Sequence, residues 1–404
     1  SMRAVLDHFW QLLTPEEQTV FQKQAVFRGG FTREAYEEVT GANLAMLSQF
    51  LDKSAIHFNE DGRYRRPSLM AQYARVRLQE NSTLYTKTRE CHARYFSKFV
   101  KRLEGEFFGG QPQKAMAPFL ADLANIRFAW EWAVEHHNAE IFNDMADTFM
   151  QAFDFAGLYR DAYDLAQQAT ASLLLLADPI TEDVTLAKGR VMGLAGAFLF
   201  RLGEYKQSLD WCQQSMQTLE EVRPHIAYAH SFVYAGAAEF GLGDMENVVT
   251  YWQKAAKEYQ AANSEWGFMT ANSNLAEVFN ALGRYEEGKS SAEHALTLAR
   301  KMHNLESIGS ASTSLAFLAL QDGKYSEATQ FAEEALRSHQ QVGHDAHIAN
   351  SLAVLAQIAS KQNNPDEARR LLEESIGILQ RVGNRLYLEQ RTQELNEVLT
   401  AQNK

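Results

Sequence analysis

The fold is decided by the stretch LGEYKQSLDWCQQSM, which runs from Leu202 to Met216 and returns four more times at intervals of 40 residues. A repeat of this length is typical of solenoids and other repeat architectures. The later copies are LGDMENVVTYWQKAA from Leu242, LGRYEEGKSSAEHAL from Leu282, DGKYSEATQFAEEAL from Asp322 and QNNPDEARRLLEESI from Gln362.

Two features of the copies predict a pair of helices joined by a tight turn. The second position tolerates a positive φ angle and separates two stretches of helical periodicity. Small side chains recur at fixed offsets on both sides of it, which lets neighbouring helices approach closely. The turn residues are Gly203, Gly243, Gly283, Gly323 and Asn363. The small residues are Gly196, Gly236, Ala276, Ala316 and Ala356 before the turn, and Ser215, Ala255, Ala295, Ala335 and Ser375 after it.

This helix–turn–helix pattern resembles the tetratricopeptide repeat, in a variant about six residues longer than the usual ~34. Gly203-Glu204-Tyr205, followed by Ser208 and Ser215, carries the resemblance. A looser copy, GLYRDAYDLAQQAT from Gly157, marks the start of the array. We therefore predict a mostly all-α chain with an α-α superhelical solenoid over residues 140–384. The polar stretch 385–404 is expected to be a capping helix.

Residues 1–80 carry a different pattern, which predicts a winged helix-turn-helix domain. The turn Asn59–Gly62 lies between Ala55–Phe58 and Arg63–Arg65, and this arrangement predicts a β-hairpin. Polar residues suited to N-capping precede the helical stretches. The expected helices are 15–27, 33–39, 44–51 and 68–78, and the expected N-caps are Thr14, Thr32 and Asn43.

A second resemblance covers nearly the whole chain. AVFRGGFTREAYEEVTG from Ala25, LSQFLDKSAI from Leu47 and GRYRRPSLMAQYARVRL from Gly62 resemble the winged-helix module that follows the nucleotide-binding domain in signal-transducing ATPases of the STAND class. His92–Leu103 and Leu120–His137 resemble the segment that joins this module to a tetratricopeptide sensor in bacterial members, so residues 81–139 are expected to be a helical linker. In that family a winged-helix residue, often histidine, touches bound ADP, and the matching stretch 66–69 contains none.

Composition narrows the classes of function. The 404 residues are 46% hydrophobic and 22% charged, and no apolar run is long enough to cross a membrane. Cys91 and Cys212 are the only cysteines, which indicates a reducing, cytoplasmic setting. Ser1-Met2 suggests a remnant of expression, so we expect the chain to be a piece of a longer protein. The STAND resemblance implies that this longer protein also holds a nucleotide-binding domain.

Charge argues against nucleic-acid binding. The net charge of −12 opposes contact with phosphates along the chain. The candidate recognition helix, 43–54, carries Lys53 beside Asp52 and no arginine. One basic cluster remains in the wing and the helix after it, and we do not expect it to bind DNA. This basic cluster is Arg63, Arg65, Arg66, Arg75 and Arg77.

One catalytic motif appears and is interpreted as a coincidence. Residues 283–290, GRYEEGKS, match the phosphate-binding pattern G-x-x-x-x-G-K-S. A working loop needs a buried strand before it, whereas here the preceding residues have helical periodicity and the motif is in register with the other repeats. Glu286 and Glu287 would repel phosphate. With no spaced set of cysteine and histidine ligands and no other catalytic pattern, we expect no enzymatic activity, cofactor or metal.

The remaining functional surface is the concave face of the solenoid, which the first helix of each repeat would line. Aromatic, amide and charged side chains mix there, and this mixture suits a peptide or protein segment. The candidate residues are Asp147, Gln151, Asp154, Arg190, Phe200, Arg201, His230, Phe240, Glu277, Asn280, Thr313, Phe317, Gln321, Asn350 and Gln357.

The STAND resemblance implies a sensor that binds an inducer, either a peptide, a protein or a small molecule. Binding would be relayed through the winged helix to the nucleotide-binding domain, in signal transduction or transcription regulation. Two alternatives stay open: a free-standing scaffold for protein–protein interaction, and a transcription factor whose winged helix contacts DNA.

Overall fold

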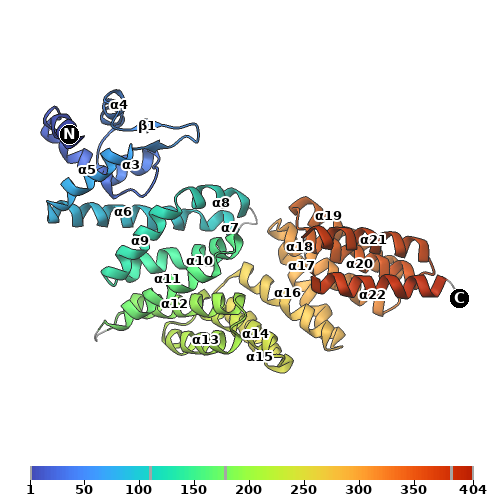
Figure 1. Ribbon diagram of the computed structural model, residues 1–404. Coiled ribbons are helices and arrows are strands. Elements are labelled where there is room, and N and C mark those ends of the chain that lie inside the picture. Colours follow the sequence, from blue (N-terminus) through green and yellow to red (C-terminus); the bar gives the residue numbers. More distant parts are fainter. Residues whose placement is uncertain (1, 109–111, 177–179, 383–384, 403–404) are drawn as a thin grey trace. The chain divides into compact units, whose positions relative to one another are not determined.

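The computed structural model describes residues 2–108, 112–176, 180–382 and 385–402, and these are mostly α-helical with one two-stranded hairpin. The chain divides into two compact units, Ser1–Leu202 and Gly203–Lys404 (Figure 1). The predicted fold class is thereby confirmed. The expected end of the repeat array at residue 384 lies outside the described residues.

The N-terminal unit opens with short, well-capped helices. The Thr14 hydroxyl accepts a hydrogen bond from the Glu17 amide, and the Glu17 carboxylate accepts one from the Thr14 amide at 2.9 Å, which forms a capping box. Thr32 and Asn43 cap the next two helices, as predicted. The elements are α1 (Met2–Gln11), α2 (Pro15–Lys23), a 3₁₀ helix (Gln24–Val26), α3 (Arg33–Thr40), α4 (Leu44–Asp52) and α5 (Ser68–Gln79).

The predicted hairpin is confirmed. β1 (His57–Phe58) pairs antiparallel with β2 (Tyr64–Arg65), and Phe31 adds a bridge to Tyr64. The helix expected to reach Phe27 ends instead at Lys23, where the 3₁₀ turn takes over and brings Phe27 into the core of the unit.

Longer helices complete the N-terminal unit and bury a polar cluster against the hairpin. The Arg63 guanidinium binds the carboxylate of Asp122, with one N–O distance of 2.9 Å, and also donates to the carbonyl of Gly30. Arg66 is half-buried and donates to the carbonyl of Phe27 at 2.9 Å. The helices are α6 (Ser82–Arg102), α7 (Glu104–Phe108), α8 (Pro112–Ala121), α9 (Leu123–Glu135), α10 (Ala139–Ala156), α11 (Tyr159–Leu174) and α12 (Glu182–Arg201).

The C-terminal unit is a stack of helix pairs whose turns follow the sequence period. Gly203, Gly243, Gly283, Gly323 and Asn363 all have positive φ angles, between 57° and 87°. Between pairs, Asn263, His303 and Gly343 also have positive φ. The helices are α13 (Tyr205–Leu219), α14 (Ile226–Leu242), α15 (Met245–Ala261), α16 (Glu265–Ala281), α17 (Tyr285–Lys301), α18 (Leu305–Gln321), α19 (Tyr325–Val342), α20 (Asp345–Lys361), α21 (Pro365–Val382) and α22 (Arg385–Gln402).

The small residues of the repeat pack where the helices meet. All ten of those predicted on either side of the turns are buried. At Gly236 the approach is so close that a Cβ atom would lie 2.5 Å from the Trp252 ring, which leaves no room for a side chain. The period therefore encodes both the turns and the contacts between helices.

Residues 283–290, which match the phosphate-binding pattern, form a helical turn and the start of a helix and not a phosphate-binding loop. Helix α16 precedes them, Gly283 makes the turn with a φ of 72°, and α17 starts at Tyr285. Gly288 lies inside α17, where a Cβ atom would be 2.4 Å from the Asn280 side-chain oxygen. The strand and glycine-rich loop of a nucleotide-binding motif are replaced here by a helix pair.

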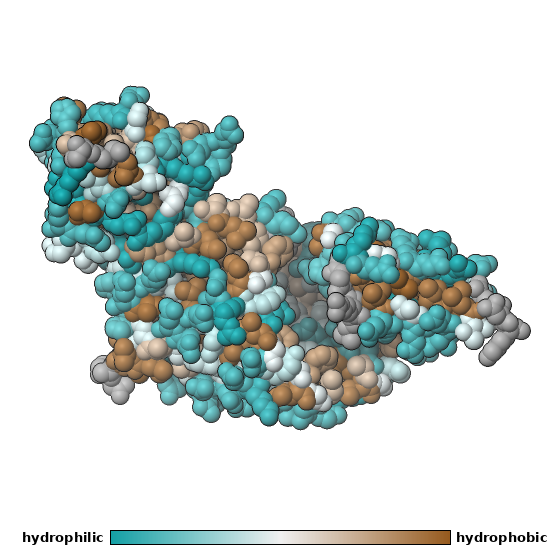
Figure 2. All heavy atoms as spheres, in the orientation of Figure 1, coloured by the Kyte–Doolittle hydropathy of each residue, from teal (hydrophilic) through white to brown (hydrophobic). Residues whose placement is uncertain are grey.

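The visible surface is largely hydrophilic. Figure 2 shows hydrophilic residues over most of each unit, with a band of apolar residues over the region of α20, α21 and α22. Among the described residues, no helix combines the length and apolar character that crossing a membrane requires.

Candidate functional site

A cavity of about 470 Å³ lies in the C-terminal unit. Its walls come from the first helices of three successive repeats, α16, α18 and α20, together with α22 and one side chain of α19. This volume lies in the range of about 300–1,000 Å³ that is common for small-ligand sites.

The repeat register brings six of the predicted binding residues into this cavity. Glu277, Phe317 and Gln357 occupy the same position on α16, α18 and α20, 40 residues apart, so stacking of the repeats aligns them in a row. We call these three residues the register row. The six residues that line the cavity are Glu277, Asn280, Thr313, Phe317, Asn350 and Gln357.

The charged residues predicted in the N-terminal unit are engaged with one another. Arg201 binds Asp154 through two hydrogen bonds of 2.7 and 2.6 Å. Arg190 forms an ion pair with Asp147 and donates to the carbonyl of Asn143 at 2.6 Å. These pairs join α10 to α12, so a ligand at this place would have to displace them.

The other predicted residues also lie away from the cavity. His230 packs edge-on against Tyr259 with ring centroids 5.5 Å apart. Gln151 and Phe200 are half-buried on α10 and α12. Phe240 and Gln321 are exposed near the C-terminal ends of α14 and α18.

Several cavity residues were missed at the sequence level. Ser310 and Ser314 lie one helical turn from predicted residues on α18, and Val354 does so on α20, so the 3.6-residue period could have found them. The contribution of α22 had no such signal, because it depends on how the last described helix packs. Further lining residues are Ala281, His339, Ala346, His347, Tyr387, Gln390 and Arg391.

Partial burial shapes the protonation of the cavity walls. Loss of hydration, and then the nearby His344, lowers the pKa of both His339 and His347 to about 4, so both imidazoles are neutral at pH 7. Loss of hydration raises the pKa of Glu277. The Glu277 residue itself is exposed to solvent on the cavity wall.

Hydrogen bonds hold the side chains of one cavity wall in place, whereas a polar atom of another wall residue has no hydrogen-bond partner. Arg391, which is buried, donates to both carboxylate oxygens of Glu394 at 2.7 Å, and Glu394 also accepts from the Gln357 amide at 3.4 Å. The side-chain oxygen of Asn280 is buried without a hydrogen-bond partner. Amide and hydroxyl side chains both donate and accept, so such walls suit the backbone of a bound peptide.

Comparison with known proteins agrees with this repeat architecture. The tetratricopeptide repeat family matches residues 267–341 and, overlapping with them, residues 307–381. Residues 267–381 of the C-terminal unit are therefore tetratricopeptide repeats. No curated protein sequence matches it.

Solved structures with a similar fold are distant in sequence. A signal transduction ATPase with numerous domains (STAND) that has a tetratricopeptide repeat sensor, from Pyrococcus horikoshii, is 14% identical with a TM-score of 0.55, over 94% of this chain and 59% of that protein. Aspartyl phosphate phosphatase F from Bacillus subtilis is 12% identical with a TM-score of 0.52, over 86% of this chain and 82% of that one. The apo form of RapI is 15% identical with a TM-score of 0.50, over 70% and 99%. At these identities the likeness concerns the fold alone.

Proposed function

We propose that this chain is the sensor part of a STAND-type signalling protein and that it binds a peptide or protein segment in the cavity of the C-terminal unit. The observation that carries the proposal is the register row, which lies in one cavity beside α22. The likeness to the P. horikoshii protein, whose repeats are a sensor, supports the same function for this chain.

The chemistry of the cavity favours a peptide over a uniformly charged polymer. One carboxyl (Glu277), one arginine already paired (Arg391) and several amides and hydroxyls surround the aromatic rings of Phe317 and Tyr387. An extended peptide offers alternating donors and acceptors to the amides and a side chain to the rings.

The N-terminal unit would transmit the binding event to a nucleotide-binding domain of the full-length protein. Large apolar side chains on this unit are exposed by 42–66%, and such a domain would cover them. An inducer acts only through its different affinities for the two states of the switch, and a shift from 1:99 to 99:1 needs about 5.5 kcal/mol. The exposed side chains are Val5, Leu12, Leu44, Phe58, Leu69 and Val76.

Peptide selection followed by cavity variants tests the binding function. Peptides of random sequence are displayed on phage and selected on the full chain, and the affinity of each is measured by fluorescence anisotropy. We expect Asn350→Ala and Glu277→Gln to weaken binding at least tenfold, which corresponds to about 1.4 kcal/mol. Gln321→Ala, on the same helix as Phe317 but outside the cavity, is the matched control and should bind normally. Peptides that bind both cavity variants as tightly as they bind the parent chain would contradict the proposal.

The relay is tested separately by hydrogen exchange of the N-terminal unit. With saturating peptide, the amides of α6 and α9 should change their exchange rates if binding is transmitted. Binding without this change favours the scaffold alternative. Because the nucleotide-binding domain would supply the chemistry, we expect no ATP hydrolysis by this chain, and measurable turnover would contradict the STAND assignment.

The DNA-binding alternative has less support. Arg63 is buried and Arg66 is half-buried in contacts within their own unit, and Arg65 pairs with Asp61. None of these three side chains is poised for phosphate contact. Salt-sensitive binding of duplex DNA that is lost on Arg65→Ala would restore this alternative.

A further inference from the structure

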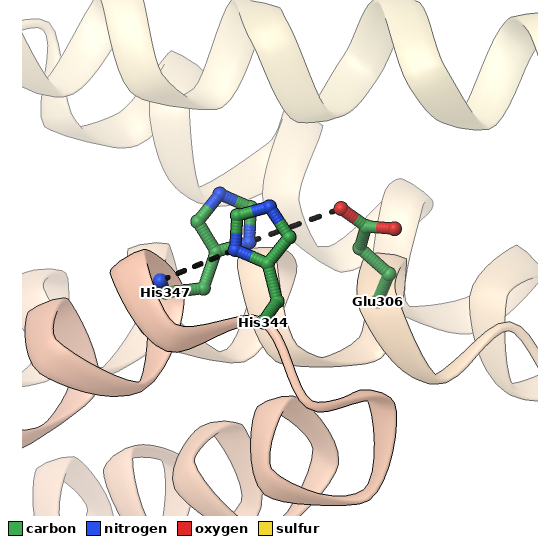
Figure 3. Close-up of side chains that lie close together, drawn as sticks. All are labelled: Glu306, His344 and His347. Carbon is green, nitrogen blue, oxygen red and sulfur yellow. Dashed lines mark hydrogen bonds and ion pairs between the residues drawn. The ribbon is translucent and has the colours of Figure 1, made fainter. Parts of the chain in front are cut away.

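Two histidines and a glutamate converge at the N-terminal ends of α18 and α20. Glu306 lies in the first turn of α18, and His344 and His347 lie at the start of α20 (Figure 3). One ligand atom of each of the three lies within 4.8 Å of the others, and the distance from Glu306 Oε1 to His347 Nδ1 is 3.9 Å. The two imidazole rings stack with centroids 3.9 Å apart.

The structural role of His344 does not account for a histidine at this position. In the two preceding repeats the same position is held by Ser264 and Asn304, whose side chains cap α16 and α18 at 3.2 and 3.0 Å. His344 caps α20 less closely, with 3.4 Å from its Nδ1 to the His347 amide. Serine and asparagine are preferred caps and histidine is not. A second function for the imidazole is therefore indicated.

His347 supplies a second, independent observation. Its Nδ1 atom is shielded from solvent and has no hydrogen-bond partner. The Glu306 carboxylate lies 3.9 Å from it, which is too far away for a hydrogen bond. A shielded nitrogen without a partner, turned toward a carboxylate and a second imidazole, is suited to bind a cation between them.

We propose that Glu306, His344 and His347 bind a divalent transition-metal ion such as zinc at the rim of the cavity. Two imidazoles and one carboxylate form a donor set that zinc, nickel, cobalt and copper accept, whereas calcium and magnesium require oxygen ligands. The positive ends of the two helices disfavour every divalent cation alike, so the nitrogen donors decide the class of metal.

The three side chains can close around such an ion with small adjustments. Zinc–ligand distances of about 2.0–2.2 Å place neighbouring ligand atoms roughly 3.4 Å apart. The 3.9 Å distance needs little change, and Glu306, which is 50% exposed, has the rotamer freedom to provide it. Three protein ligands leave at least one coordination position open. Because His347 also lines the cavity, a ligand in the cavity can complete the coordination of the metal.

Titration of the metal-free full chain with Co²⁺ and with Zn²⁺ tests the site. Cobalt is followed by its visible absorption, and zinc by calorimetry. We expect one tight site per chain, weakened at least tenfold by His344→Asn and by Glu306→Gln. His344→Asn restores the cap that Asn304 provides one repeat earlier, so α20 should keep its structure, which circular dichroism checks.

A matched control separates this site from the remaining histidines of the chain, which has 12 histidines including His344 and His347. His303→Asn places at a positive-φ turn the residue that Asn263 provides one repeat earlier, and it should leave metal affinity unchanged. The proposal is overturned if neither ion binds, or if His344→Asn and Glu306→Gln bind the metal as tightly as the parent chain and His303→Asn.

Discussion

At the scale of single residues, a buried polar cluster determines how the hairpin of the N-terminal unit meets its long helices. The Asn125 oxygen accepts from the Arg28 amide at 2.6 Å, and its nitrogen donates to the Gly30 carbonyl and to Asp122. His92, which is fully buried, contacts the same Asn125 oxygen at 3.3 Å. Because that oxygen is an acceptor, His92 carries a proton on Nε2 and donates it to Asn125.

This burial makes the N-terminal unit sensitive to acid. Burial, and then the charges of Arg89 and Arg28, lowers the pKa of His92 to about 3 in spite of the Asn125 hydrogen bond, against about 6.5 for unfolded histidine. Between these pH values only the unfolded state binds the proton. The stability that depends on neutral His92 is complete above about pH 6.5 and is lost as the pH falls toward 3.

We therefore expect His92→Gln to flatten the acid limb of the stability curve. Between pH 6 and pH 4 the parent chain should lose about 1.4 kcal/mol more per pH unit than the variant. The free energy of unfolding is measured by hydrogen exchange of α6 amides at several pH values. His57→Gln, at an exposed position of β1, should keep the slope of the parent chain. Equal slopes for His92→Gln and the parent would show that His92 is not the group responsible.

In the same buried cluster, the partner of a charged side chain could not be predicted from the sequence. Arg63 belongs to the basic cluster that the sequence places in the wing and the helix after it. In the structure it is buried against Asp122, 59 residues further along the chain. A pairing over this distance depends on the packing of the hairpin against α8 and α9, and neither spacing nor composition encodes it.

At the scale of helices, contacts between repeats depend on positions that hold no side chain. A Cβ atom at Gly267 would lie 2.1 Å from the ring of Tyr259, so α15 and α16 pack at a distance that only glycine permits. In contrast, a Cβ atom at Gly377 in α21 would meet no atom within 4 Å. These two glycines lie in similar helices and serve different purposes.

Alanine at these two glycines should have opposite effects on stability. Gly267→Ala forces Tyr259 or the helix backbone to move, and we expect it to destabilise the C-terminal unit by about 1–3 kcal/mol. Gly377→Ala should stabilise the same unit by up to about 1 kcal/mol, because alanine is the better helix former. Urea unfolding followed by hydrogen exchange of the C-terminal unit measures both. Equal effects would mean that the close contact at Gly267 relaxes without cost.

Helices and turns were largely predictable because the period constrains them. Each turn residue from Gly203 to Asn363 has the positive φ that its place in the repeat required. The capped helices of the first 80 residues begin where Thr14, Thr32 and Asn43 predicted. The 3₁₀ turn at Gln24–Val26 was not predicted, because helical periodicity continues through it and the core position of Phe27 ends the α-helix.

At the scale of the molecule, each compact unit carries its own buried core, and α22 completes the core of the C-terminal unit. Leu388, Leu395 and Val398 of this helix pack against a cluster that includes Leu352 and Leu372. A stack of repeats needs such a cover, because its last pair would otherwise expose an apolar face. The same helix supplies Tyr387, Gln390 and Arg391 to the cavity, so the cover is also a wall of the candidate site.

A charge on the inner face of α22 should therefore disturb both the core and the cavity. We expect Leu388→Asp to destabilise the α20–α22 region by about 2–3 kcal/mol, because a carboxylate would lie where an apolar side chain packs. Hydrogen exchange of α20 and α21 should accelerate. Asn396→Asp, at an exposed position of the same helix, is the control and should leave exchange unchanged. Slow exchange in both variants would mean that α22 contributes little to the core.

The candidate site was predictable only where the repeat constrains it. The register row followed from positions 40 residues apart, and all three of its members lie in the cavity. The predicted residues Asp147 and Arg190 instead form an ion pair between α10 and α12, which no period encodes. The wall from α22 depends on the packing of one helix that is not part of the repeat.

Because the turns are evenly spaced, recombination can change the number of repeats during evolution. An unequal exchange between two copies of the gene, shifted by one period, would add or remove 40 residues. Every turn residue would still fall in a turn, and every small residue would still face a neighbouring helix. The row that begins with Glu277 and Phe317 would gain or lose one member. The lineage can thus lengthen or shorten its binding surface in single steps without redesigning the fold.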